Sequence, residues 1–68
     1  MNLTVNGSEL SAEASLTIAL LVARVAPGRE ERGTAVALNG TVVPKGEWSS
    51  TMLSEGDRIE VLHAIGGG

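Results

Sequence analysis

The sequence of this 68-residue chain predicts an α+β fold, in which a mixed sheet of about four to five strands packs on one helix. Two Asn-Gly dipeptides, at 6–7 and 39–40, each lie between short runs of alternating polarity, a pattern typical of β-hairpins. One apolar stripe with helical spacing lies between the two hairpins, and a last alternating run follows them. Pairs of strands that precede and follow a single helix in the sequence favour a fold in which the helix packs against one face of a sheet.

The first hairpin is expected at the start of the chain. Leu3 and Val5 alternate with polar residues, as in a strand with one buried face. The dipeptide at 6–7 suits a two-residue turn, because both of its residues tolerate positive φ. The return strand is expected over residues 8–14, with Leu10 on the inner side.

A helix is expected after this hairpin. The hydroxyl of Thr17 can accept a hydrogen bond from the first helical turn, which makes Thr17 a suitable N-cap. Leu16 and Leu21 have the spacing of a hydrophobic staple. Pro-Gly at 27–28 ends the helix. The apolar stripe, with spacing i, i+3, i+4 and i+7, consists of Ile18, Leu21, Val22 and Val25.

The second hairpin is expected to join strands at 35–39 and 41–43. Pro44 ends the second of these strands, because proline cannot donate to a sheet ladder. Residues 45–52 are expected to form an irregular or single-turn segment, in which Trp48 covers one end of the core.

The last strand is expected over residues 57–65, after a turn that contains Gly56. If it pairs with the first strand, the two are parallel, because the connection between them includes the helix. The core is then almost purely aliphatic. Its expected members are Leu3, Val5, Ile18, Leu21, Val22, Val25, Val36, Leu38, Leu53, Ile59 and Val61.

The composition argues against several classes of function. The net charge is −3 and the five basic residues are scattered, which disfavours binding to nucleic acid. The absence of cysteine excludes disulfides, thiolate metal sites and a cysteine nucleophile, and no set of metal ligands is apparent. No apolar run approaches the ~20 residues that span a bilayer, and no signal peptide is recognisable. A soluble, cytoplasmic protein without membrane contact is therefore expected.

The three glycines Gly66, Gly67 and Gly68 are the most informative feature of the sequence. They follow directly on the last predicted strand, so the expected organisation is a domain over 1–64 and a flexible reactive tail over 65–68. An α-carboxylate on Gly68 is ionised at neutral pH, because its pKa is near 3.5. Four extended residues reach at most about 14 Å, which is enough to enter the active site of a partner.

Three stretches of the chain resemble the ThiS family of sulfur carriers, within the ubiquitin-like β-grasp proteins. They are the first strand and turn at 1–7, the stretch 37–48 with its Asn-Gly turn, Val-Pro and Trp48, and the ending at 55–68 with its acidic-Gly-Asp turn and terminal Gly-Gly. The resemblance covers the whole chain. It implies a β-grasp fold and a carrier protein that is acted on by enzymes and is not itself an enzyme.

The resemblance also implies a reaction cycle at Gly68. An adenylating enzyme, similar to ubiquitin-activating enzymes, uses ATP to convert the carboxylate of Gly68 into an acyl-adenylate. A persulfide, supplied by a donor such as a cysteine desulfurase, converts it into a thiocarboxylate. Thiazole synthase then takes the sulfur for the thiazole of thiamin. In this cycle the chain itself binds no cofactor, and Gly66 and Gly67 thread the tail into the partners.

The docking surface for such partners is predicted from strand alternation. If Ile59 and Val61 point inward, Leu62 points outward beside the tail. Val42 joins it if its neighbours on the strand face the other way. Exposed apolar residues beside a reactive tail are suited to docking, although single exposed aliphatic residues are ordinary on protein surfaces.

Three other functions remain open from the sequence. The first is the small, sulfur-donating subunit of molybdopterin synthase, or another ubiquitin-like sulfur carrier. The second is a β-grasp interaction module, and the third is a protein tag joined through Gly68.

The single histidine, His63, has no serine, cysteine or carboxylate arranged to form a catalytic relay with it, so a partly exposed strand residue is the expected interpretation.

Overall fold

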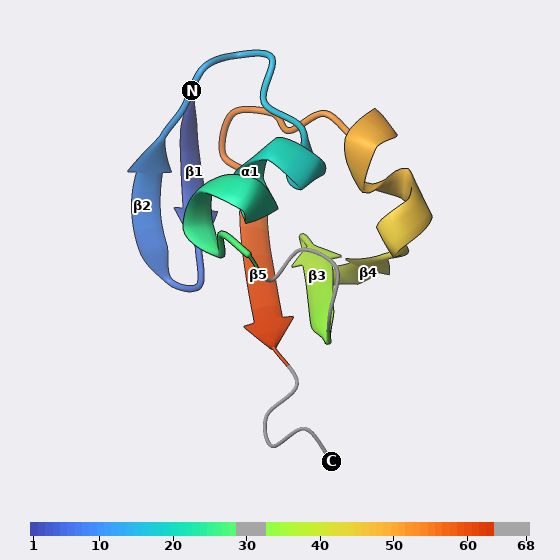
Figure 1. Cartoon of the computed structure of the whole chain (residues 1–68). Coiled ribbons are helices and arrows are strands. Elements are labelled where there is room, and N and C mark those ends of the chain that lie inside the picture. Colours follow the sequence, from blue (N-terminus) through green and yellow to red (C-terminus); the bar gives the residue numbers. More distant parts are fainter. Residues whose placement is uncertain (29–32, 64–68) are drawn as a thin grey trace.

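The computed structural model describes residues 1–28 and 33–63, and within these residues one helix crosses one face of a single mixed sheet (Figure 1). The strand order is β2-β1-β5-β3-β4. Strands β1 and β5 are parallel, and the other neighbouring pairs are antiparallel. This arrangement confirms the predicted β-grasp fold. The elements are β1 (Asn2–Val5), β2 (Ser8–Ser11), α1 (Ile18–Val25), β3 (Thr34–Leu38), β4 (Thr41–Val43), the 3₁₀ helix η1 (Lys45–Ser50) and β5 (Arg58–His63).

Both Asn-Gly dipeptides form the predicted hairpin turns. Asn6 and Gly7 have φ of 50° and 83°, and Asn39 and Gly40 have φ of 51° and 88°. Positive φ at both central residues matches the twist of the flanking strands. The return strand of the first hairpin is shorter than the predicted 8–14. It ends at Ser11, which pairs with Asn2, the first residue of β1, and beyond it the amide of Ala12 still donates to the carbonyl oxygen of Met1 at 2.8 Å.

The helix begins as predicted, with the hydroxyl of Thr17 accepting a hydrogen bond from the amide of Leu20 at 3.2 Å. The prediction that Val25 is buried is wrong, because its side chain is 40% exposed. Helical spacing assigns a residue to a face, but it does not say how far along the helix the sheet covers that face. At this end of α1 the buried residue is Ala26, the C-cap.

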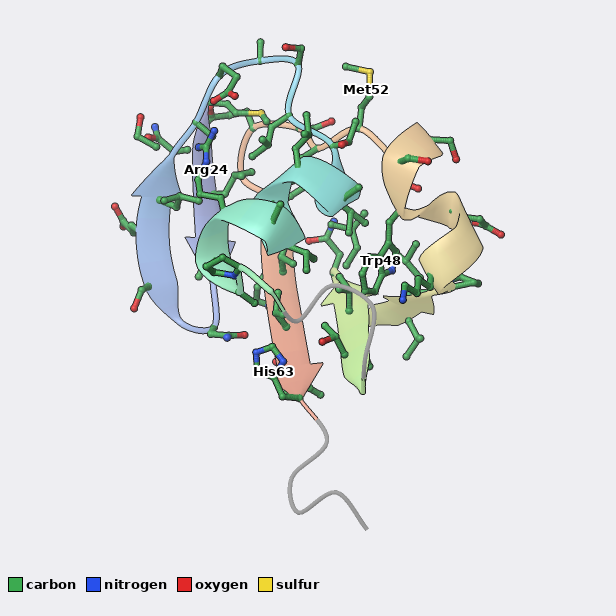
Figure 2. The ribbon with its side chains drawn as sticks, viewed as in Figure 1. Arg24, Trp48, Met52 and His63 are labelled. Carbon is green, nitrogen blue, oxygen red and sulfur yellow. The ribbon has the colours of Figure 1, made fainter. Side chains whose placement is uncertain are left out.

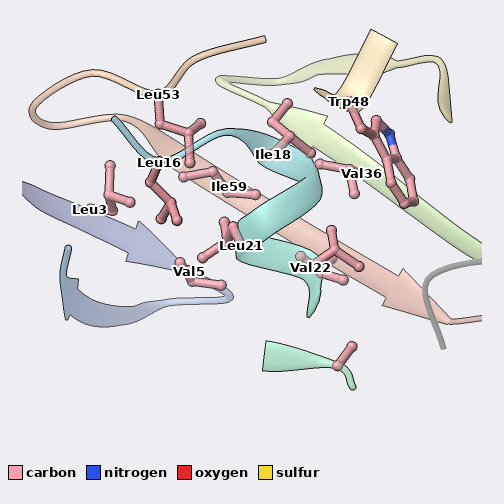
Figure 3. Close-up of a cluster of buried hydrophobic side chains, with 12 residues drawn as sticks. Leu3, Val5, Leu16, Ile18, Leu21, Val22, Val36, Trp48, Leu53 and Ile59 are labelled. Carbon is pink, nitrogen blue, oxygen red and sulfur yellow. The ribbon is translucent and has the colours of Figure 1, made fainter. Parts of the chain in front are cut away.

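The core lies between α1 and the sheet (Figure 3). It contains two large residues absent from the predicted set, Leu16 and Trp48. Trp48 covers one end of the core, and its indole Nε1 donates to the carbonyl oxygen of Val43 at 3.0 Å. Leu38 is half-buried against the core. The buried members are Leu3, Val5, Leu16, Ile18, Leu21, Val22, Ala26, Val36, Trp48, Leu53, Ile59 and Val61.

Strand β5 is the central strand of the sheet and leads to the C-terminal glycines. It is described as far as His63, so the predicted end of this strand at residue 65 lies outside the described residues. The predicted boundary between domain and tail, at 64–65, lies outside them as well.

Candidate functional site at the end of β5

The predicted reactive residues, Gly66, Gly67 and Gly68, lie outside the described residues. The described part of the candidate site is the strand that leads to them and the surface around that strand. His63 marks the end of β5 in Figure 2.

Strand β5 is paired on one edge as far as its described end, and on the other edge at its start. It pairs with β3 from Leu38↔Ile59 to Thr34↔His63, and with β1 at Thr4↔Arg58 and Val5↔Ile59. Its inward side chains, Ile59 and Val61, are 0% and 4% exposed. Burial of each contributes about 1.5–3 kcal/mol to folding. The position of β5, from which the chain continues to residue 64, is therefore fixed by pairing with its neighbours and by two side chains buried in the core.

The predicted outward orientation of Leu62 and Val42 is confirmed, since their side chains are 61% and 69% exposed. The register places both on the same face of the sheet, with Ala35 opposite Leu62 and Ala37 opposite Val42. Strand β3 lies between the two large side chains. They are separated by two strand spacings and by two residues along the strands, or roughly 12 Å. We call Ala35, Ala37, Val42 and Leu62 the outer sheet patch.

The outer sheet patch has a charged margin on β5. Glu60 pairs with Ala37 in the register, and Arg58 and Glu60 are both exposed on the same face as Leu62. The outer sheet patch is thus a shallow apolar strip with one acidic and one basic group beside it. An apolar centre with a polar margin is the usual composition of a protein interface. The role of Leu62 and Val42 in docking stays a prediction.

The sequence interpretation missed part of this surface. Ala35 and Ala37 form the floor of the outer sheet patch, and alanine carries too little apolar area to attract notice in a sequence. Strand alternation predicts an outward side chain for Leu62, and for Val42 on the condition that its neighbours face the other way, but only the β3–β4 and β3–β5 registers show that the two lie on the same side.

His63 lies on the same side of β5 as Ile59 and Val61 and is half-buried, which agrees with the predicted partly exposed strand residue. Its Nδ1 lies 3.2 Å from the hydroxyl oxygen of Thr34, the residue opposite it in the register. This contact joins the last described residue of β5 to the start of β3.

The other exposed apolar side chains lie away from this site. Leu20 on α1 is 55% exposed. Met52, which is labelled in Figure 2, forms an isolated bridge with Thr17 and is 58% exposed. Nη2 of Arg24, on α1, donates to both carboxylate oxygens of Glu13, at 3.0 and 3.1 Å. A backbone hydrogen bond at Glu13 and this guanidinium lower the pKa of the Glu13 carboxyl.

Among the described residues there is neither a pocket nor a cluster of metal ligands. No group of three or more histidine, aspartate and glutamate side chains in these residues lies close enough to share a metal ion. Residues 1–28 and 33–63 contain no helix with the length and apolar character needed to cross a membrane.

Comparison with known proteins identifies relatives over the full length of the chain. A family model described as the ThiS family matches residues 2–68. The crystal structure of a thiamine biosynthesis protein (ThiS) from Geobacter metallireducens is similar, with a TM-score of 0.83 and 34% sequence identity over 100% of both chains. An NMR solution structure of a thiamine biosynthesis protein from the same organism has a TM-score of 0.79 and 34% identity, over 100% of this chain and 88% of that one.

Two curated relatives are much longer than this chain. Both are named thiazole synthase. The one from Paramagnetospirillum magneticum is 35% identical over 68 residues, and the one from Magnetococcus marinus is 38% identical over 68 residues. Each match covers 100% of this chain and 20% of the relative, so the chain spans about a fifth of their length.

Proposed function

The chain belongs to the ThiS family, and from this premise we propose that it is a sulfur carrier protein for the thiazole of thiamin, with sulfur carried on the C-terminal carboxyl group of Gly68. The observation that carries the proposal is the extent of the family match, which runs from residue 2 to Gly68 and so includes the terminal glycines. In this proposal the chain is a substrate of its partner enzymes and not a catalyst.

The chemistry begins with activation of a carboxylate. A carboxylate is a nucleophile but a poor electrophile, so it must acquire a leaving group before sulfur can attack its carbon. An oxygen of the Gly68 carboxylate attacks the α-phosphorus of ATP in an adenylating enzyme, pyrophosphate leaves, and an acyl-adenylate forms. The terminal sulfur of a persulfide then displaces AMP. A second thiol cleaves the S–S bond, is oxidised to a disulfide, and leaves the thiocarboxylate.

The architecture of the domain suits this role. The glycines at 66–68 follow a strand that is paired with β3 as far as His63, so the domain can dock while its terminal residues enter the partner. Glycine has no Cβ, which lets the backbone adopt conformations in a narrow channel that other residues do not. The outer sheet patch is the proposed docking surface for the adenylating enzyme.

Thiazole synthase is the proposed acceptor of the sulfur. Two relatives that carry this name include a segment similar to the whole of this chain. A shared chain keeps two partners at high effective concentration, which is useful when one must deliver a group to the other. This observation favours the thiazole pathway over the molybdopterin pathway that the sequence also left open.

The proposal is tested by intact mass spectrometry of the protein incubated with an adenylating enzyme of this pathway, Mg-ATP, a cysteine desulfurase and cysteine. The expected result is a mass increase equal to the exchange of one oxygen for one sulfur, located at Gly68. A variant that lacks Gly68 should fold and remain unmodified. Isopeptide-linked adducts, or sulfur on a variant without Gly68, would show that the proposed function is wrong.

A further inference from the structure

The side chain of Asn6 contacts β5 near the point where the strand leads to the glycines. Its Nδ2 donates to the carbonyl oxygen of Val61 at 3.2 Å, and its Oδ1 accepts from the amide nitrogen of Val61 at 2.8 Å. The backbone amide of Asn6 also donates to the carbonyl oxygen of Ile59 at 2.9 Å. One residue at the tip of a hairpin therefore makes three hydrogen bonds to the central strand.

These bonds extend the sheet beyond the end of β1. The last register pair between β1 and β5 is Val5↔Ile59. The carbonyl of Arg58 accepts from the amide of Asn39, so by alternation the backbone groups of Val61 point to the β1 side. Strand β1 has already turned at this point. The amide side chain of Asn6 takes the place of the missing strand residue and supplies one donor and one acceptor.

Asparagine is the residue that combines the two requirements at position 6. The backbone φ of 50° is in the left-handed region, which asparagine adopts more readily than most non-glycine residues. Its side chain carries both a donor and an acceptor, whereas ionised aspartate has no donor and glycine has no side chain. The hairpin turn and the contact with Val61 therefore both depend on Asn6.

We propose that Asn6 is a positioning residue, which fixes the direction in which β5 delivers the chain to Gly68. This inference rests on the proposed function. From Val61 to Gly68 the chain has seven further residues, which reach at most about 24 Å when extended. Without Asn6, the backbone of Val61 loses its partners on the β1 side, so the last described residues of β5 are held by β3 alone and the point from which the chain continues to Gly68 is less fixed.

The second Asn-Gly turn provides a matched control. Asn39 has a φ of 51°, close to that of Asn6. Its side chain accepts from the amide of Arg58 at 2.9 Å and donates to Oδ1 of Asp57 at 3.0 Å. It therefore holds β5 in a similar way, but at the opposite end of the strand. Asn39→Gly and Asn6→Gly each remove one donor and one acceptor from a turn that glycine can also adopt.

The first measurement is amide hydrogen exchange by NMR on the full chain. Asn6→Gly should speed exchange of the Val61 amide by about tenfold or more relative to the buried amide of Val36, since both hydrogen bonds to Val61 are lost. Asn39→Gly should leave this ratio unchanged. If the ratio does not rise in Asn6→Gly, or rises equally in Asn39→Gly, the positioning role is wrong.

The second measurement is adenylation of Gly68, followed as ATP–pyrophosphate exchange with the adenylating enzyme. Asn6→Gly should lower kcat by about tenfold and leave KM within about twofold, because the outer sheet patch is intact while fewer docked molecules present the carboxylate in reach of ATP. Asn39→Gly should change neither constant. Equal kcat losses in the two variants would reduce Asn6 to a structural role. If the wild-type chain is not adenylated at all, the proposed function fails and the positioning role fails with it, even if the exchange ratio rises.

Discussion

Leu62→Glu is the sharpest test of the outer sheet patch as a docking surface. The substitution places a charge in the outer sheet patch, on the strand that leads to Gly68. The matched control is Ser11→Glu. Ser11 is exposed on β2, where it pairs with Asn2 and lies on the same face of the sheet as the outer sheet patch. Ser11→Glu changes the net charge by the same amount as Leu62→Glu.

The exposure of Leu62 sets the expected magnitude. Complete burial of a leucine side chain contributes about 1.5–3 kcal/mol. Because the side chain is 61% exposed in the free protein, docking can still gain roughly 0.9–1.8 kcal/mol from it. Loss of this contribution raises KM by roughly 5- to 20-fold, before any cost of burying the new carboxylate.

The effect on folding should be smaller. About two fifths of the Leu62 side chain is covered, which corresponds to roughly 0.6–1.2 kcal/mol of the free energy of unfolding. For a domain of this size the melting temperature would then fall by roughly 2–10 °C. The domain would remain folded at 25 °C, so that a change in KM reports on docking.

The assay is ATP–pyrophosphate exchange with the adenylating enzyme at 25 °C, together with a thermal melt of each variant. Leu62→Glu should raise KM at least fivefold, and Ser11→Glu should leave it unchanged. A KM for Leu62→Glu equal to that of the wild type would refute the assignment, and an equal rise in both variants would indicate that charge, and not the outer sheet patch, is responsible.

Three further predictions concern the fold. Trp48→Phe removes the hydrogen bond to Val43 and should lower the free energy of unfolding by about 1–3 kcal/mol in a urea titration; an unchanged midpoint would contradict the importance of this contact. Thr17→Ala removes the N-cap of α1 and should cost about 1 kcal/mol in the same titration, whereas Thr17→Ser should cost little. Because the pKa of Glu13 is lowered in the folded state, its carboxylate contributes to stability above its ordinary pKa of 4.5, and this contribution is lost as the pH falls through the folded-state pKa. The difference in melting temperature between the wild type and Glu13→Gln should therefore vanish on acidification. A difference that grows in acid would show that the sign is wrong.

Local signals predicted most elements of the fold. Each Asn-Gly turn depends on the φ preferences of two neighbouring residues, and the start of α1 depends on one hydroxyl and the amides that follow it. Such interactions span few residues, so a sequence shows them directly. The predicted orientation of Leu62 also follows from a local rule, the alternation of side chains along a strand.

Errors arose where distant segments decide the outcome. Leu16 is predicted only as one half of a hydrophobic staple and is absent from the predicted core, yet it is fully buried there. Val25 has the spacing of a buried residue, yet it is partly exposed at the end of α1. Burial depends on which other segment lies over a residue, and that contact is made by residues far away in the chain.

The sequence by itself determined the two hairpins, the single helix, the kinship with sulfur carriers and the terminal glycines as the proposed site of chemistry. Those features follow from local backbone preferences and from residue types. The tertiary structure decided that β5 is the central strand, that Val42 and Leu62 share a face across β3, and that Asn6 reaches Val61. These relations join residues as far as 55 positions apart, and only the pairing of strands brings them into contact.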